Sequence, residues 1–146
     1  YIYQTPKEVV LVSQRGHQIR HVYLNQPHSA HPGHSWYGES VGHYENGDTL
    51  VIDTVGFNEK TAIDRFGTPH STELHVVERY RLTDGGKKLQ IVFTVDDPKT
   101  FTTKWSAMME FRHVASVLTE TICAENNTDF FTGKLYPIPI ATKPDF

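Results

Sequence analysis

Three histidines stand at intervals of three residues in the segment "PHSAHPGHSWYG" (Pro27–Gly38). Because imidazole nitrogens bind copper and zinc, His28, His31 and His34 are candidate metal ligands. Prolines break up this segment, and its spacing is no established ligand pattern, unlike His-Glu-x-x-His on a helix. We therefore expect a polar lid over a binding site that needs no cofactor, with a copper or zinc site as the alternative.

Within this lid, His28 is the histidine that we expect at the rim of the site, because its phrase "PHS" recurs at His70. Two aromatic residues, Trp36 and Tyr37, follow the histidines. Their flat rings suit stacking on an aromatic or sugar ligand. The segment therefore predicts one side of a small-molecule site.

The segment "TPHSTELHVVER" (Thr68–Arg79) places four acid–base side chains within nine residues: His70, Glu73, His75 and Glu78. Imidazole and carboxylate groups together suit general acid–base catalysis, because burial tunes the pKa of each toward neutral pH. We expect His70 and Glu73 to reach the mouth of a pocket and His75 to point across it. The alternative is a solvent-exposed rim.

Asp53 stands in "TLVIDTV" (Thr49–Val55), which is otherwise apolar on both faces except for Thr54. We expect this carboxylate to be at least partly buried, so it needs a cation or several hydrogen-bond donors. Arg20 and Arg79 are the candidate partners by pattern. Asp53 then forms either a structural ion pair inside the fold or a charged pocket floor that positions a ligand.

Glu120, in "ETICAE" (Glu120–Glu125), is a further candidate for ligand binding. In the same segment stands Cys123, the single cysteine, so no intramolecular disulfide forms. A lone cysteine in an apolar strand is more typical of a core residue than of a nucleophile.

The sequence has no Gly-x-Ser-x-Gly, P-loop, Gly-x-Gly-x-x-Gly or Cys-x-x-Cys motif, which argues against the common hydrolases, nucleotidases and dinucleotide enzymes.

The elements that must position these residues are strands almost throughout, because β-branched and aromatic residues alternate between turn signals. The expected strands are Tyr1–Thr5, Glu8–Gln14, His17–Leu24, Glu39–Glu45, Asp48–Val55, Glu73–Leu82, Leu89–Asp96, Lys104–His113 and Ser116–Glu125. Hairpin turns are expected at Arg15-Gly16, Asn46-Gly47 and Asp84–Gly86. Two longer connections, Asn25–Gly38 and Gly56–Thr72, are typical of functional loops.

The fold predicted from this pattern is all-β, an antiparallel meander of eight or nine strands that forms a lipocalin-like barrel or a sandwich. With 146 residues the chain is one domain, with the barrel over residues 1–132 and a proline-rich extended arm over 133–146. Side chains alternate along a strand, so His75, Val77 and Arg79 share one face, and Val76 and Glu78 share the other.

The charge and the hydropathy of the chain limit the classes of partner that it is expected to bind. A formal charge of −3 argues against nucleic-acid binding, which needs a basic face. No run approaches the ~18 apolar residues of a membrane-spanning helix. We expect a small-molecule ligand, and a homodimer through an edge strand or the C-terminal arm is an open alternative.

From Arg20 to about Asn127 the chain resembles a family of uncharacterised bacterial β-rich proteins that often carry export signals. The phrases that carry the resemblance are "GESVGHYENGDTLVIDTVGFNEKT", "GTPHSTELHVVERYRL", "VDDPKTFTTKW" and "ETICAENN". The resemblance implies a periplasmic or secreted protein. Because the chain starts at Tyr1 without a methionine and "YIYQTP" already has the pattern of a strand, we expect a processed or trimmed product. Its recurring polar positions correspond to Arg20, His28, Asp53, Thr54, Asn58, His70, Ser71, His75, Glu78, Arg79, Asp97, Glu120 and Glu125.

These residues favour a cofactor-independent acid–base enzyme of the lyase or isomerase type. His70 or His75 is the base, Glu78 or Asp53 orients it, and Arg20 or Arg79 holds an anionic oxygen. A second hypothesis is an exported binding protein for copper, zinc or a hydrophobic ligand, whose pocket is lined by Phe93, Met108, Met109 and Phe111. A third is a protein-interaction domain that uses an edge strand and the proline-rich arm.

Overall fold

The computed structural model describes residues 1–13, 18–115, 117 and 132–134. The chain divides into two units, Tyr1–Ala115 and Ser116–Phe146, and every described strand belongs to the first. The turn predicted at Arg15-Gly16 lies outside the described residues. So do almost all of the strand predicted at Ser116–Glu125 and of the proline-rich arm.

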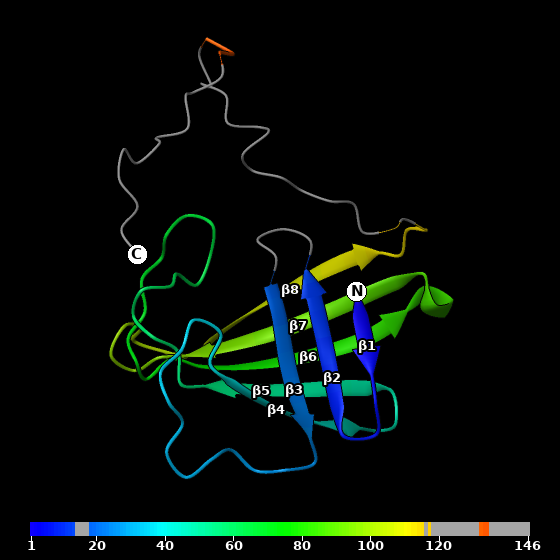
Figure 1. Cartoon of the computed structure of the whole chain (residues 1–146), viewed down its shortest axis with the longest axis horizontal. Coiled ribbons are helices and arrows are strands. Elements are labelled where there is room, and N and C mark those ends of the chain that lie inside the picture. The colour runs from blue at the N-terminus through cyan, green and yellow to red at the C-terminus, as the bar shows by residue number, and fades with distance from the viewer. Residues whose placement is uncertain (14–17, 116, 118–131, 135–146) are drawn as a thin grey trace, which may run out of the picture. The chain divides into compact units, whose positions relative to one another are not determined.

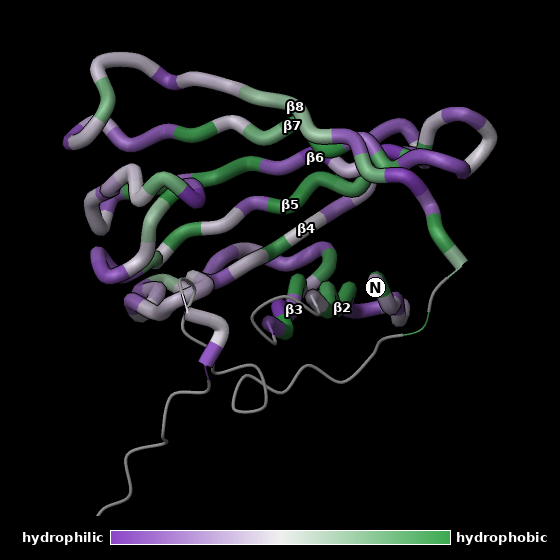
Figure 2. Tube along the Cα trace, turned by 90° about the horizontal axis from the view of Figure 1, so that it is seen from above, coloured by the Kyte–Doolittle hydropathy of each residue, from purple (hydrophilic) through white to green (hydrophobic). Residues whose placement is uncertain are grey.

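Eight strands form one sheet whose spatial order is the order of the sequence (Figure 1). They are β1 (Ile2–Gln4), β2 (Glu8–Ser13), β3 (Gln18–Leu24), β4 (Glu39–Glu45), β5 (Thr49–Val55), β6 (His75–Thr83), β7 (Lys88–Asp96) and β8 (Trp105–Arg112). The sheet curls into a half-barrel in which β1–β3 cross β4–β8 at a steep angle (Figures 1 and 2). The all-β prediction is confirmed, and within the described unit the sheet is open, with β1 and β8 as its edges.

One strand pair departs from the antiparallel prediction. β3 and β4 run parallel, and three residue pairs join them, from Val22↔Ser40 to Leu24↔Gly42. Parallel neighbours need a crossover of about a dozen residues or more, which the long connection between Leu24 and Glu39 supplies. That connection therefore returns the chain along the sheet, and the corner of the half-barrel lies where pairing is short.

The predicted short turns are confirmed where the structure describes them. Asn46, Gly47 and Asp48 join β4 to β5, one residue more than the predicted two-residue hairpin. Asn46 and Gly47 have φ angles of 52° and 75°, the left-handed pair of a primed turn, and the Asp48 N–H donates to the Glu45 carbonyl at 3.3 Å. A 3-10 turn, η2 (Asp84–Gly86), joins β6 to β7. A helical turn is absent from the described connection between β5 and β6.

Side-chain alternation gives the sheet two different faces. Leu50, Ile52 and Thr54 of β5 point to what we call the inner face, the concave side of the half-barrel, where Val9 and Val22 complete a buried cluster. Intervening residues point to the outer face, and hydrophobic and hydrophilic positions alternate along the strands (Figure 2). No helix within the described ranges has the length and apolar character needed to cross a membrane.

Candidate functional site

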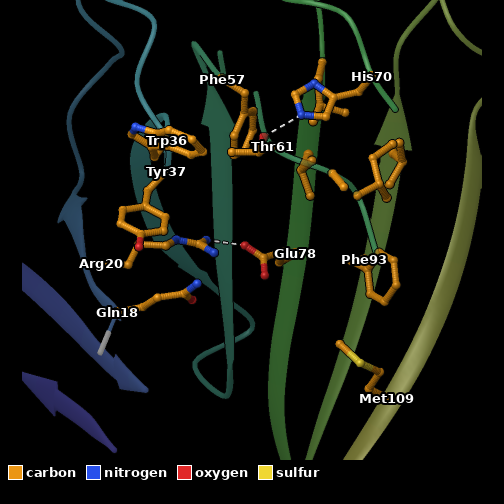
Figure 3. A pocket seen from close by; sticks show the side chains of 15 residues that line it. Gln18, Arg20, Trp36, Tyr37, Phe57, Thr61, His70, Glu78, Phe93 and Met109 are labelled. Carbon is orange, nitrogen blue, oxygen red and sulfur yellow. Dashed lines mark hydrogen bonds and ion pairs between the residues drawn. The ribbon is translucent and has the colours of Figure 1, made fainter. Parts of the chain in front are cut away.

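An open pocket of about 340 Å³ lies on the inner face (Figure 3). Its apolar wall comes from β6, β7, β8 and the connection between β5 and β6, through Leu74, Val76, Phe93, Val95, Met109, Phe57, Ala62 and Ile63. Its polar lining consists of Gln18, Arg20, Thr61, His70 and Glu78. A small number of polar groups in an apolar cavity is the usual composition of a small-molecule site.

The two long connections meet at this pocket. The Ser35 N–H donates to the Gly56 carbonyl at 2.9 Å, and the Asn58 N–H donates to the Ser35 carbonyl at 2.9 Å. This backbone bridge places Trp36 and Tyr37 on the pocket wall with Phe57 (Figure 3). Both aromatic residues that the sequence places beside the site therefore line this pocket, and Trp36 is 56% exposed.

An ion pair between Arg20 of β3 and Glu78 of β6 occupies the middle of the pocket (Figure 3). Arg20 also donates from Nε to Ser40 Oγ at 3.1 Å and from Nη2 to Thr54 Oγ1 at 3.4 Å. All hydrogen bonds that Arg20 makes to described residues use Nε and Nη2. Its Nη1 group therefore remains available to a ligand oxygen.

Tyr80 completes this ion-pair network on the side away from Arg20. Its hydroxyl donates to Glu78 Oε1 at 3.0 Å. Burial and the charge of Glu78 raise the pKa of Tyr80, so its hydroxyl keeps the proton that it donates. Glu78 is thus held from two sides, and its carboxylate fixes the guanidinium of Arg20 rather than orienting a histidine.

His70 is buried at one end of the pocket. Its Nδ1 lies 2.9 Å from the Ser71 carbonyl, which can only accept, so Nδ1 carries a proton. Its Nε2 lies 2.6 Å from Thr61 Oγ1. In the neutral ring Nε2 accepts from the Thr61 hydroxyl, and in the charged ring Nε2 donates while Thr61 turns its proton to the Asn58 carbonyl at 3.3 Å. Both charge states are therefore satisfied without movement of the ring.

Asp97 positions the segment that carries His70. Both of its oxygens accept from Ser71, from the N–H and from the hydroxyl, each at 2.6 Å. Burial opposes the charge of Asp97, but the hydrogen bonds from Ser71, Thr100 and Lys99 outweigh it and lower the pKa of Asp97 to about 2. The sequence pattern alone did not indicate this anchor, which only the family resemblance placed among the polar positions.

Asp53 lies on the outer face, and the prediction of an arginine partner is wrong. Its Oδ1 accepts from His28 Nε2 at 2.9 Å and from His75 Nε2 at 2.9 Å. Arg20 is on the inner face, and Arg79 pairs with Glu45 at 3.5 Å. The imidazoles replace the arginines because the connection after β3 brings His28 down onto the sheet.

The expected acid–base group is consequently divided between the two faces. Val76 and Glu78 point into the pocket, so His75 points away from it, and the prediction that His75 crosses the pocket is wrong. Glu73 does not line the pocket and pairs with Lys99 Nζ at 2.7 Å. Glu120 lies outside the described residues.

The three histidines of Pro27–Gly38 are not gathered at one point. His28 binds carboxylates on the outer face, while His34 Nδ1 donates to the Phe57 carbonyl at 3.1 Å and His31 is exposed. Across the ranges that the structure describes, no three His, Cys, Asp or Glu side chains are arranged to hold a metal ion. Of the four residues expected around a hydrophobic ligand, Phe93 and Met109 line the pocket.

Comparisons of the chain with protein-family models, with curated proteins and with solved structures give no match. The function is therefore argued from the site. Sequence reasoning missed Thr61, the partner of His70, and Ser40, the partner of Arg20. Their signal was faint, because a single hydroxyl residue in a loop or strand has many ordinary roles.

Proposed function

We propose that this chain binds a small molecule with an apolar, aromatic-sized body and an anionic or carbonyl oxygen in the inner-face pocket. The observation that carries the proposal is the position of Arg20, which is the sole Lys or Arg among the described residues that line this mainly apolar cavity. None of the described residues accepts a hydrogen bond from its Nη1 group, and the remaining guanidinium hydrogens are held by Glu78, Ser40 and Thr54. A guanidinium fixed in this way is preorganised for an oxygen acceptor.

The expected pose follows from the pocket lining. The ligand oxygen lies at Arg20, and the apolar body lies against Trp36, Phe57 and Phe93. Burial of an aromatic ring supplies affinity by removing apolar surface from water at about 25 cal/mol per Å². The charge-assisted hydrogen bond supplies the selectivity for the head group.

The test uses cinnamate and cinnamyl alcohol, which share an aromatic body and differ in the head group. Amide chemical shifts in NMR titrations report both affinity and location. We expect cinnamate to bind about tenfold more tightly than the alcohol, since a hydrogen bond to a charged group contributes about 1.5–3 kcal/mol. The shifted resonances should belong to residues that line the pocket.

Arg20→Lys and Arg79→Gln form the variant pair. Arg79 is exposed on the outer face, so Arg79→Gln should leave both affinities unchanged. Arg20→Lys keeps the charge but loses the fork of donors, and it should reduce the preference for cinnamate. Equal affinity of the unmodified chain for the two probes, or shifts confined to the outer face, would overturn the proposal.

A second candidate function is acid–base catalysis on the bound molecule, of the isomerase or lyase type. The observation that favours it is the 2.6 Å contact between His70 Nε2 and Thr61 Oγ1 on the pocket wall. Since His70 has hydrogen-bond partners in both charge states, it can take up and release a proton without movement of its ring, while the Thr61 hydroxyl turns. The Thr61 hydroxyl would relay that proton to the ligand.

Phenylpyruvate in D2O tests this activity, because it combines an aromatic ring, a carboxylate and an acidic C–H next to a carbonyl. Loss of the CH2 proton signal measures exchange with solvent. We expect exchange at least ~10²-fold faster with the chain than in buffer, the usual contribution of a positioned acid–base group. His70→Asn should remove the acceleration while keeping cinnamate binding. Exchange at the buffer rate would exclude His70 as a base for this class of ligand.

A further inference from the structure

His28 lies between two carboxylates on the outer face. Its Nδ1 is 3.0 Å from Glu39 Oε1 of β4, and its Nε2 is 2.9 Å from Asp53 Oδ1 of β5. We propose that His28 is a positioning residue for the inner-face pocket, whose doubly protonated ring clamps β4 and β5 at the point where they hold Arg20. This inference rests on the proposed function, because it concerns regulation of the same pocket by pH.

The contacts of His28 require a charged ring. A carboxylate only accepts, so both ring nitrogens must donate, and a neutral imidazole has one N–H. The neighbouring Ser29 strengthens the contact, since its N–H and its hydroxyl each donate to Glu39 at 2.7 Å. These Ser29 bonds lower the pKa of Glu39, so this carboxylate does not take up a proton to relieve a neutral His28.

Every element packed around His28 contributes a charged or titratable group. Glu39 comes from β4, Asp53 from β5, and His75 from β6 through its bond to Asp53 Oδ1. His31 and His34 share the connection with His28 and are exposed. Within the described part of the chain, no Lys or Arg forms an ion pair with Glu39 or Asp53. In that part of the chain, the imidazoles of His28 and His75 are therefore the partners of these two carboxylates.

The clamp and the pocket use adjacent residues of the same two strands. Glu39 and Asp53 face outward, and their chain neighbours Ser40 and Thr54 face inward, where they bind Arg20. Ser40 and Thr54 are register partners, and their hydroxyls are 2.9 Å apart. The outer-face clamp thus ties together the two backbone positions that carry the guanidinium on the inner face.

The corner between β3 and β4 makes this coupling effective. Three residue pairs join these strands, against seven between β4 and β5. Arg20 lies on the β3 side of the corner, two residues before the paired segment, and reaches across it to Ser40. Because His28 belongs to the connection that leaves β3, loss of the clamp releases this connection from β4 and β5 beside a junction that has few other backbone bonds.

The direction of the pH effect follows from the charge of the ring. The clamp is complete when both N–H groups of His28 donate. Raising the pH removes protons from imidazole, and a His28 ring with a single N–H presents a lone pair to one of the two carboxylates, so that this contact becomes repulsive. Probe binding in the pocket should therefore weaken as the solution becomes alkaline.

The experiment measures cinnamate affinity by NMR titration at about pH 5.5 and about pH 8.5, on either side of the histidine range, in about 0.15 M salt. His28→Gln keeps a polar side chain but loses the two N–H groups that point from separate ring nitrogens to separate carboxylates. His43→Gln is the matched control, because His43 is an exposed histidine of β4 that is 3.6 Å from a single carboxylate, Glu45. We expect affinity to fall three- to tenfold with pH in the unmodified chain and in His43→Gln. His28→Gln should bind weakly at both pH values.

A second readout is independent of any probe. Nitrogen-15 shifts of the His28 ring should show protons on both nitrogens at about pH 5.5. Exchange of the Asn25 amide, which donates to the Gly42 carbonyl at 2.8 Å, should accelerate in His28→Gln. A singly protonated ring at that pH, or unchanged exchange of Asn25 in His28→Gln, would overturn the clamp.

If both readouts support the clamp but cinnamate binds at neither pH, the proposed function is wrong and the clamp is not. Equal pH dependence in all three chains would overturn the coupling to the pocket.

Discussion

Arg20 and Glu78 form an ion pair across the inner face although they stand 58 residues apart and on strands that are not neighbours. β4 and β5 run between them and contribute only the short side chains of Ser40 and Thr54 at this level. The small hydroxyls leave room for the guanidinium above the sheet and also bind it. The polar centre of the pocket is therefore built by four strands, with long residues at its sides and short ones beneath.

The ion pair between Arg20 and Glu78 predicts that removing one charge lowers the free energy of unfolding more than removing both charges does. Arg20→Met leaves the largely buried Glu78 without a counter-charge and should reduce the free energy of unfolding by about 2–3 kcal/mol. Arg20→Met with Glu78→Met removes both charges and should restore most of the loss. Urea titrations followed by circular dichroism give the two free energies. A double variant no more stable than the single one would show that the pair is not a coupled unit.

The hydrogen bond between Thr61 and His70 should stabilise the connection between β5 and β6. Thr61→Val keeps the shape of the side chain and removes the hydroxyl, so Nε2 of the buried His70 loses its partner. We expect a loss of about 1–3 kcal/mol in the free energy of unfolding, the usual cost of an unsatisfied buried polar atom. Thr103→Val, in an exposed position, is the control and should change stability by no more than about 0.5 kcal/mol.

Strand alternation was enough to predict much of this architecture, because it depends on neighbouring residues alone. It correctly placed Val76 and Glu78 on one face and His75 on the other. It could not identify the partner of Asp53, since His28 reaches it from a connection 25 residues away whose path no local pattern specifies. The parallel pairing of β3 and β4 was missed for the same reason.

The contact between the two long connections gives a test with an internal control. Gly56 has φ of 74°, and a Cβ there would lie 2.8 Å from the Gly33 carbonyl oxygen. Gly67 has a similar φ of 81°, but a Cβ there meets nothing within 4 Å. Both Gly→Ala changes carry the backbone strain of about 1 kcal/mol, and Gly56→Ala alone adds the clash.

Gly56→Ala should therefore destabilise more than Gly67→Ala and should alter the fluorescence of Trp36, which follows the bridge at Ser35. Thermal unfolding and tryptophan emission measure the two effects, with Trp105→Phe in both chains so that Trp36 alone reports. Equal stability of the two alanine variants would mean that the connections move apart without cost.

The low pKa of Asp97 predicts how the free energy of unfolding depends on pH. Its pKa is about 2 in the folded chain, against an ordinary value of 3.8, because Ser71, Thr100 and Lys99 donate to the buried carboxylate. A lowered folded-state pKa contributes stability that is fully present above the unfolded-state value and is lost as pH falls toward the folded-state value. The contribution of Asp97 should thus disappear between about pH 4 and about pH 2 and should amount to about 2 kcal/mol. Asp97→Asn should be less stable at neutral pH and should lose less stability over that interval.

The control is Asp96→Asn, whose native carboxylate pairs with the exposed Lys104 at 2.7 Å, and it should keep the acid dependence of the unmodified chain. Parallel stability curves for the unmodified chain and Asp97→Asn between these pH values would refute the assignment, and urea titrations at each pH provide the curves.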